Sequence, residues 1–197
     1  MAMRTGQEYM VNYLRDVCLA GTSDYTFNGG TYWTDNQLAD ILNKTASVSS
    51  HINAIPISQE TQGTLYYYQY QIPGAWFEDE TSGTPYFHIY DGMGTAIGTA
   101  DFTLEPKTGM LTFDDDRGGS AVTLNITRYN INQAAADLWR RKAAHISEVS
   151  YDISLDGHKL SRSQRVSLYM SMAREYEAQS GFSEIPVVRS DIMGVNL

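Results

Sequence analysis

Apolar residues in the first third of the chain recur at the three- and four-residue steps of an α-helix. The first set consists of Tyr9, Tyr13, Leu14, Val17 and Cys18. These positions share one helical face, and Gly21 is a natural stop for the helix that carries them. The second set consists of Leu38, Ile41, Leu42 and Val48. Thr34 followed by Gln37 forms a capping box in front of it, which predicts a second helix.

The middle of the chain changes to the two-residue alternation of β-strands. One face of the predicted strand at 66–72 carries Tyr66, Tyr68, Tyr70 and Ile72. Val122, Leu124 and Ile126 alternate with polar residues, which is typical of a half-buried strand. The segment Glu105–Gly109 reads as a turn between two further short strands. Short strands joined by glycine-rich turns favour a small sandwich or barrel.

The last third returns to helical spacing, and Asn130 or Asn132 can cap its first helix. The apolar stripe of that helix consists of Ala134, Ala135, Leu138, Trp139, Ile146 and Val149. A further helix follows the capping box Ser161–Gln164 and ends near Gly181. Its apolar positions are Val166, Tyr169, Met170, Ala173 and Tyr176. The segment Ser183–Leu197 shows no periodicity, so we expect an extended tail.

Together these patterns predict an α+β protein, a four-helix bundle with a β-rich insertion between helices two and three. We expect the bundle to comprise residues 1–48 and 130–182, the inserted β module residues 49–129, and the tail residues 183–197. The β module carries 3 basic and 10 acidic groups, and it holds 12 of the 23 aromatic residues. The first segment carries 3 basic and 5 acidic groups, and residues 130–197 carry 8 of each. This contrast supports a separate module between two helical flanks.

The composition argues against several classes of protein. The 197 residues carry a net charge of −9, which disfavours a general nucleic-acid binder that relies on neutralising phosphates. Cys18 is the one cysteine, so no internal disulfide or cysteine-built zinc site can form. No apolar run approaches the ~20 residues that span a bilayer, so we expect no membrane contact. The first ten residues lack the layout of a secretory signal.

Residues suited to catalysis or ligand binding are scattered. The histidines His51, His88, His145 and His158 lie in four different segments. Only His145 has a carboxylate, that of Glu148, on the next helical turn, and a metal site needs a second such pair. The acidic runs Glu78–Glu80 and Asp114–Asp116 read as solvated turns, because they lack calcium-loop spacing. The glycine-rich segment 91–98 leads into a strand instead of a phosphate-binding helix. We therefore expect no catalytic, metal-binding or cofactor-binding residues, no cofactor, and no enzymatic activity.

The tyrosine run in the predicted strand favours a contact with another protein. Neighbouring side chains on a strand point to opposite faces, so tyrosine is exposed on one face if the other fills the core. Tyrosine is common in interfaces, and we predict a subunit interface at Tyr66, Tyr68 and Tyr70. A strand buried on both faces is the alternative interpretation. A second functional hypothesis is a carbohydrate- or ligand-binding β module on a helical scaffold, with tyrosines for sugar stacking and acidic loops for calcium.

A basic run on the third predicted helix is a second candidate surface. Arg140, Arg141 and Lys142 follow one another there and read either as a solvated face or as a contact surface. In an acidic protein such a surface can meet the acidic module of an identical neighbour. Contacts of this head-to-tail kind between unlike surfaces close a ring.

Several soft motifs occur in a fixed order along the chain. They are Tyr25–Leu38, Thr108–Asp114, Asn130–Trp139, Tyr151–Gly157 and Ser161–Gln164 ahead of Tyr169–Arg174. This order resembles structural proteins of tailed bacteriophages and prophages, specifically their head–tail connector (adaptor) proteins. The resemblance covers most of the chain. The family's core is a small helical bundle, and the β module at 49–129 looks like an insertion relative to its shortest members.

The resemblance implies a non-enzymatic part of the virion neck, assembled in the host bacterial cytoplasm. Such connectors form a ring, commonly of twelve copies, that docks under the portal protein and meets the next neck or tail protein. DNA would pass through the lumen without specific binding, which suits negative walls that repel phosphate. By analogy the tail would dock to the portal. Its anchors would be Pro186, Val187, Val188, Ile192 and Met193.

Overall fold

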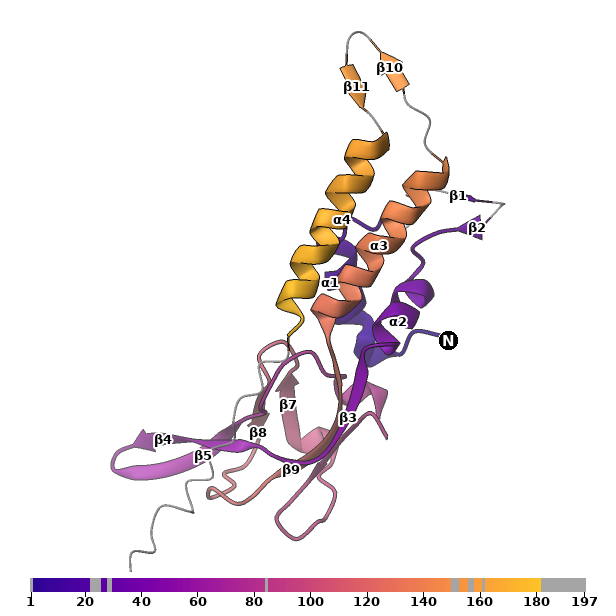
Figure 1. Cartoon of the computed structure of the whole chain (residues 1–197). Helices are drawn as coiled ribbons and strands as arrows, with labels where there is room; N and C mark the ends of the chain where they lie inside the picture. The colour runs from indigo at the N-terminus through magenta and orange to yellow at the C-terminus, as the bar shows by residue number, and fades with distance from the viewer. Residues whose placement is uncertain are drawn as a thin grey trace, which may run out of the picture.

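The computed structural model of the chain describes residues 2–21, 26–27, 30–83, 85–149, 153–155, 158–160 and 162–181. Its helices gather at one end of an elongated molecule and its larger sheets at the other (Figure 1). The helices are α1 (Glu8–Val17), α2 (Asp35–Asn43), α3 (Ile131–Val149) and α4 (Arg162–Gln179). Short 3-10 helices are η1 (Thr5–Gln7), η2 (Glu80–Ser82) and η3 (Thr99–Asp101). The described chain is therefore α+β.

The strands between α2 and α3 form two antiparallel sheets. They are β3 (Ala46–Asn53), β4 (Ile55–Thr61), β5 (Thr64–Gln71), β6 (Phe87–Tyr90), β7 (Phe102–Glu105), β8 (Met110–Phe113) and β9 (Thr123–Tyr129). One sheet has the order β3-β9-β6 and the other the order β4-β5-β8-β7. Two small hairpins lie among the helices, β1 (Thr26–Phe27) with β2 (Gly30–Thr31) and β10 (Ile153–Leu155) with β11 (His158–Leu160).

The capping box predicted for the second helix is confirmed. The Thr34 hydroxyl accepts a hydrogen bond from the Gln37 amide at 3.4 Å, and the Gln37 side chain accepts one from the Thr34 amide at 3.0 Å. Placing Val48 on this helix is wrong, because α2 ends at Asn43 and Val48 lies in β3 with 71% of its surface exposed. The run of serine, threonine and valine after the helix has low helix propensity and suits a strand.

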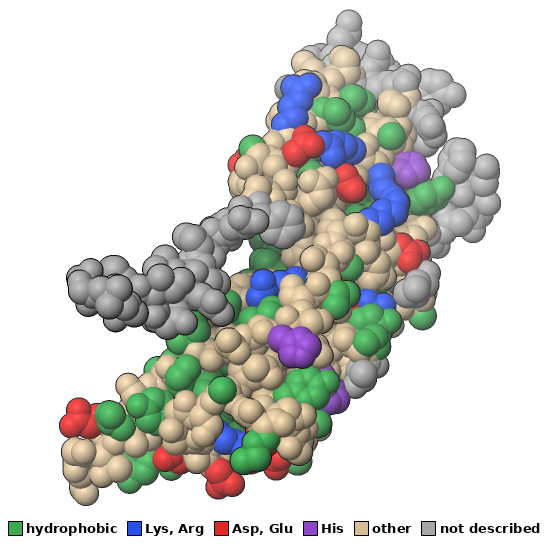
Figure 2. All heavy atoms as spheres, turned by 60° about the horizontal axis from the view of Figure 1, so that its bottom comes forward, with side chains coloured by type: hydrophobic (Ala, Val, Ile, Leu, Met, Phe, Trp, Pro, Cys, Tyr) green, Lys and Arg blue, Asp and Glu red, His purple; other side chains and the backbone are tan. Residues whose placement is uncertain are grey.

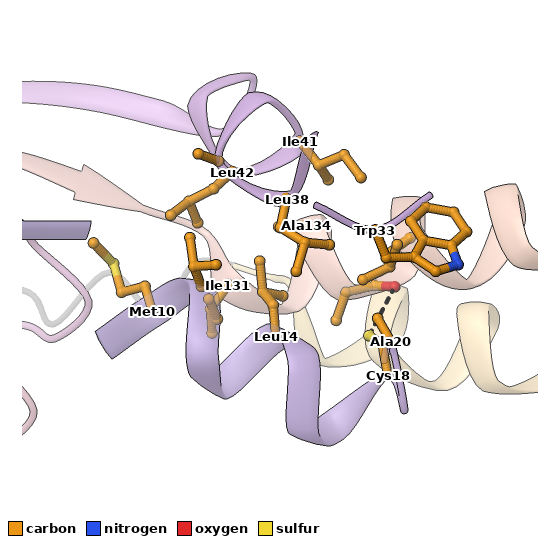
Figure 3. Packing of buried hydrophobic residues seen from close by; sticks show 14 of the residues in the cluster. Met10, Leu14, Cys18, Ala20, Trp33, Leu38, Ile41, Leu42, Ile131 and Ala134 are labelled. Carbon is orange, nitrogen blue, oxygen red and sulfur yellow. Dashed lines mark hydrogen bonds between the residues drawn. The ribbon is translucent and has the colours of Figure 1, made fainter. Parts of the chain in front are cut away.

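The helical core lies where α1, α2 and the first half of α3 meet. Figure 3 shows Met10 and Leu14 of α1 pointing toward Leu42 of α2 and Ile131 of α3, and all four are buried. Alanines on α3 line the same core and let the helices approach closely. Asn130 caps α3, as predicted, because its side chain accepts a hydrogen bond from the Gln133 amide at 3.0 Å.

The expected four-helix bundle is wrong. The helices α1 and α2 have 10 and 9 residues, whereas α3 and α4 have 19 and 18. The short pair therefore covers only one end of the long pair, which extends beyond it as a hairpin (Figure 1). Among the described side chains of α4, Ala173 is the one that is fully buried. A bundle needs four helices of similar length that each bury a face, and α4 packs mainly along α3 instead.

A second core belongs to the strands. It draws on both sheets and consists of Ala54, Tyr70, Ile72, Phe77, Phe87, Ile89, Phe102, Leu111, Phe113, Val122, Leu124 and Ile126. Phe102 lies between the rings of Phe87 and Phe113, with centroid distances of 6.3 and 6.2 Å. The predicted turn at Glu105–Gly109 joins β7 to β8. The two cores thus have separate compositions, and the chain passes between them after α2 and again before α3.

Candidate functional site

The described residues contain one buried ion pair, and it lies where the helical core meets the strands. Arg4, just before η1, binds Glu78, which follows the buried Phe77. The guanidinium donates from Nε to Oε2 at 2.9 Å and from Nη2 to Oε1 at 2.6 Å. Glu78 is fully buried, so its charge is balanced inside the protein by Arg4. The hydrogen bond that Arg4 donates to Glu78 raises the pKa of Arg4, and burial opposes this shift.

Three further side chains complete this junction network. Arg4 also donates to the side-chain oxygen Oδ1 of Asn43 at the end of α2, at 2.9 Å, and to the Tyr129 hydroxyl at the end of β9, at 2.8 Å. Gln7 donates to the same two oxygens at 2.7 and 3.0 Å. The Tyr129 hydroxyl donates to Glu78. Burial and the bond to Glu78 raise the pKa of Tyr129. The network therefore ties η1, α2, β9 and the segment before η2 in one fixed arrangement.

Close backbone contact reinforces the junction. Gly6 lies so near the η2 turn that a methyl group at its Cα would stand 2.3 Å from the Ser82 hydroxyl and 3.1 Å from the Asp79 carbonyl oxygen. Tyr9 of α1 donates to the Phe77 carbonyl at 2.8 Å. Its ring lies nearly parallel to that of Trp76, with centroids 6.2 Å apart. The junction is thus a closely packed contact between the helical core and the strands.

The spacing of the charged residues in the sequence did not predict this network. Glu78 reads as part of a solvated acidic turn, yet it is fully buried, because its partner Arg4 is 74 positions away in the chain. The signal that was available is the sequence Trp76-Phe77, two large aromatic residues directly before the acid. Such residues bury whatever adjoins them, and a buried carboxylate requires a partner.

The histidines are not brought together. His51 lies in an irregular stretch of β3, where its amide donates to the Asn125 side chain at 2.9 Å. His88 packs against the Tyr90 ring in β6, and His145 against the Tyr32 ring with centroids 4.6 Å apart. Within the described parts of the chain, no three histidine, cysteine or carboxylate side chains are grouped to hold a metal ion. His158 and the side chain of Glu148 lie outside the side chains described.

In the acidic and glycine-rich loops, aspartate side chains accept hydrogen bonds from nearby backbone amides. Asp116 accepts hydrogen bonds from the Tyr67 amide at 2.8 Å and from the Gly118 amide at 2.9 Å, which ties the loop after β8 to β5. Asp91 accepts in the same way from Met93 and Thr95 at 2.9 and 2.8 Å. These carboxylates stabilise tight turns, and Asp91 closes the glycine-rich loop on itself.

The three predicted interface tyrosines differ in exposure. Tyr70 is fully buried in the strand core, and its hydroxyl donates to the Ser120 carbonyl at 3.0 Å. Tyr66 and Tyr68 are half-buried, and their rings stack with centroids 5.9 Å apart. The register of β4 against β5 shifts between Ile57 and Gln59, which interrupts the regular alternation expected for this strand. A subunit interface stays a prediction for Tyr66 and Tyr68, while Tyr70 serves the core.

The three residues of the basic run on α3 also differ in their surroundings. Arg140 pairs with Asp137 at 3.1 Å and with Glu177 of α4 at 2.5 Å. Lys142 donates to the carbonyls of Cys18 and Leu19 at 2.8 and 2.7 Å, where it closes the end of α1. Arg141 is exposed. Arg140 and Lys142 therefore hold the helices together, and Arg141 is the member of the run that projects outward.

Charge is distributed unevenly over the surface. Figure 2 shows Lys and Arg side chains mostly over the helical half, where acidic side chains lie among them, while hydrophobic and further acidic side chains lie over the sheet end. None of the described helices combines the length and apolar character needed to cross a membrane. The five anchors predicted in the tail lie outside the described residues. A comparison with family models and with curated proteins finds no match to this chain.

Proposed function

We propose that this protein is a structural joint of a bacteriophage neck, a head–tail connector that transforms no molecule. The observation that carries the proposal is the junction network around Arg4 and Glu78. Its buried charged and titratable side chains hold the helical core in a fixed position against the strand core. A protein that transmits position between two partners needs such a fixed internal geometry.

The shape of the molecule supports the same role. The α3–α4 hairpin projects from one end and the β4–β5 hairpin from the other, so the body has two separate contact regions (Figure 1). A connector must hold one protein at each end. Packed cores joined by a buried polar network resist bending between the two ends, because the hydrogen bonds of the network favour one arrangement.

The charge distribution supports a DNA passage lined by the strand module. That module has 10 acidic and 3 basic groups, and Asp101, Asp114 and Asp115 in it are exposed. Negative walls repel phosphate within roughly a Debye length, about 8 Å at physiological salt. DNA would then move through a ring of such modules without sticking.

Binding to the portal protein of the same phage tests the proposal. The full chain is mixed with purified portal, and complexes are detected by mass measurement and by cryo-electron microscopy of the collar. A variant that ends before Ser183 should retain its helical circular-dichroism signal and lose portal binding. In a control of full length, serine replaces Pro186, Val187, Val188, Ile192 and Met193, and the same loss is expected. A full chain that neither binds portal nor appears in the collar would end the proposal.

The carbohydrate-binding hypothesis keeps its own test. Tyr70 is buried and Asp116 is engaged with backbone amides, so Tyr66 and Tyr68 are the tyrosines left for sugar stacking. Glycan-array binding that disappears in Tyr66→Ala and Tyr68→Ala variants would favour this second function.

A further inference from the structure

The strands β3 and β4 form a continuous exposed ribbon. They follow one another with only Ala54 between them, and each is the edge strand of its own sheet. Ile52 in β3 and Ile57 in β4 are half-buried, Ser49 likewise, and the other residues of both strands are exposed. The outer hydrogen-bonding edge of both strands therefore faces away from the described part of the protein, and such an edge is a template for another strand.

The ribbon carries less charge than the surface around it. Glu60 is the one acidic residue between Ala46 and Thr61, and the stretch contains no lysine or arginine. Natural edge strands are usually protected from pairing by lysine, proline or bulges. Here the irregularity between Ser49 and Ile52, the proline at Pro56 and the register shift between Ile57 and Gln59 interrupt the ribbon. The start of β3, Ala46–Ser49, and the end of β4, Gln59–Thr61, remain suitable for pairing.

Large apolar side chains are exposed on the same ribbon and on its neighbour. Val48 is 71% exposed, Ile55 56% and Leu65 53%. Figure 2 shows hydrophobic side chains over the projecting hairpin of β4 and β5. The residues pairing β5 with β8 are Gln69–Gln71, so the hairpin beyond them consists of two strands only. An isolated two-stranded hairpin is marginally stable in water, and added contacts would hold it.

The low charge of the ribbon permits contact with a second copy of this chain. Two copies that each carry a net charge of −9 repel one another over most of their sheet surfaces. The ribbon is the long exposed stretch where this repulsion is weakest and where strand edges can pair. A neighbour's equally uncharged edge is therefore complementary to it in both charge and hydrogen bonding.

We propose that β4 of one copy pairs with β3 of the next copy and extends its three-stranded sheet to four strands. This proposal rests on the proposed connector function. The contact joins unlike edges, so it can repeat from copy to copy until a ring closes. Pairing of like edges, β4 with β4, would instead stop at two copies. The regular parts that can pair are of similar length, Ala46–Ser49 in β3 and Gln59–Thr61 in β4.

Cross-linking between engineered cysteines tests the contact. Ser47 in β3 and Ser58 in β4 are exposed, so the Ser47→Cys and Ser58→Cys substitutions leave the cores unchanged. The full chain that carries both is treated with a short bis-maleimide reagent over a series of protein concentrations. Cys18 is buried and desolvation raises its pKa to about 12, so it stays unreactive at neutral pH. The matched control combines Ser58→Cys with Ser167→Cys, an exposed serine of α4.

The expected result is a ladder of multimers from the Ser47/Ser58 pair, with at least tenfold less product from either single variant and from the control pair. Adding Val48→Lys, which changes an exposed side chain, should remove the ladder. A dimer from Ser58→Cys alone would assign the edge to like-with-like pairing and overturn the proposal. So would the absence of any ladder, or a ladder of equal strength in the control.

The outcome is separable from the proposed function. Portal binding without a ladder would retain the connector and reject this contact. A ladder without portal binding would retain the contact between copies and reject the connector.

Discussion

The two cores of this protein are built in opposite ways. The helical core combines chain segments from the first 42 residues with segments from Tyr129 onward, and aliphatic side chains and alanines dominate it. The strand core comes from one continuous stretch, Ala54–Ile126, and is rich in aromatic residues. The strand core can therefore assemble within its own segment, whereas the helical core requires that segment to be bridged first.

The two halves also differ in how their outer parts are held. In the strand half, Asp91 and Asp116 hold turns by bonding backbone amides. In the helical half, α4 runs along α3 with Ala173 as its one fully buried side chain among those described. The comparison teaches that the strand half is fixed locally, while the helical half depends on distant contacts. The junction around Arg4 links the two, and its loss should affect the helical half more.

The largest effect is expected from breaking the junction. Arg4→Met leaves the buried Glu78 carboxylate without its cation, which typically costs about 3 to 5 kcal/mol. Chemical denaturation followed by far-ultraviolet circular dichroism measures the loss of unfolding free energy. Near-ultraviolet signals should show the helical half melting at lower denaturant than the strand half, so that one transition becomes two.

The double variant Arg4→Met with Glu78→Met separates charge from packing. Replacing both members of a buried pair by apolar residues is often close to neutral, so most of the lost stability should return. Tyr129 keeps a hydrogen bond from Gln7 in this variant. If the double variant is as unstable as Arg4→Met alone, the unpaired charge does not cause the loss of stability. The lost packing of the Arg4 side chain would then be the cause.

The next largest effect is expected within the strand half, at Gly109. Its φ of +73° is disfavoured for other residues, and a Cβ there would lie 2.8 Å from the Ile72 carbonyl oxygen. Gly109→Ala should therefore lose about 2 to 4 kcal/mol, from the left-handed backbone and the overpacking together. Thermal unfolding measures it.

Gly118→Ala is the matched control for this turn. Gly118 has φ +58° but nothing within 4 Å of its added methyl group, so it carries the backbone cost without the contact. A loss in Gly109→Ala that does not exceed the loss in Gly118→Ala would show that the strand half absorbs the contact and is less tightly fixed than we argue.

Local features were predictable from the sequence, and the arrangement of elements was not. The capping box at Thr34, the turn at Glu105–Gly109 and the cap at Asn130 depend on residues within a few positions, and all three are confirmed. The bundle failed because periodicity reports which face of a helix is apolar and not how far its partners extend. The short α1 and α2 cover only one end of the α3–α4 pair, and their lengths therefore decide whether a bundle forms.

The junction network was missed for a related reason. Arg4 and Glu78 each look like ordinary surface charges in their own segments, and only the tertiary fold places them together. Arg140 and Lys142 show the converse, since a run that reads as one surface is divided by helix packing into structural and outward-facing members. Side-chain roles set by distant contacts lie beyond what spacing alone can predict.

A smaller loss is expected at Gly6, where the backbone of η1 approaches the η2 turn. Gly6→Ala places a methyl group 2.3 Å from the Ser82 hydroxyl, so we expect a loss of about 1 to 3 kcal/mol. Gly92→Ala is the control, because its nearest contact is an ordinary 3.5 Å. Equal unfolding midpoints for the two variants would mean that the η2 turn yields, and that the junction relies on the ion pair alone.

The smallest effect sharpens the contrast between local and distant stabilisation inside the helical half. Thr34→Ala removes the cap of α2, which usually costs about 1 kcal/mol. If the helical half depends on distant contacts, this local loss should lower the unfolding midpoint only slightly and leave the slope of the transition unchanged. Thr34→Ser retains the hydroxyl and should behave like the natural chain. A Thr34→Ala loss as large as that of Arg4→Met would reverse the argument, because local capping would then stabilise the helical half as much as its junction does.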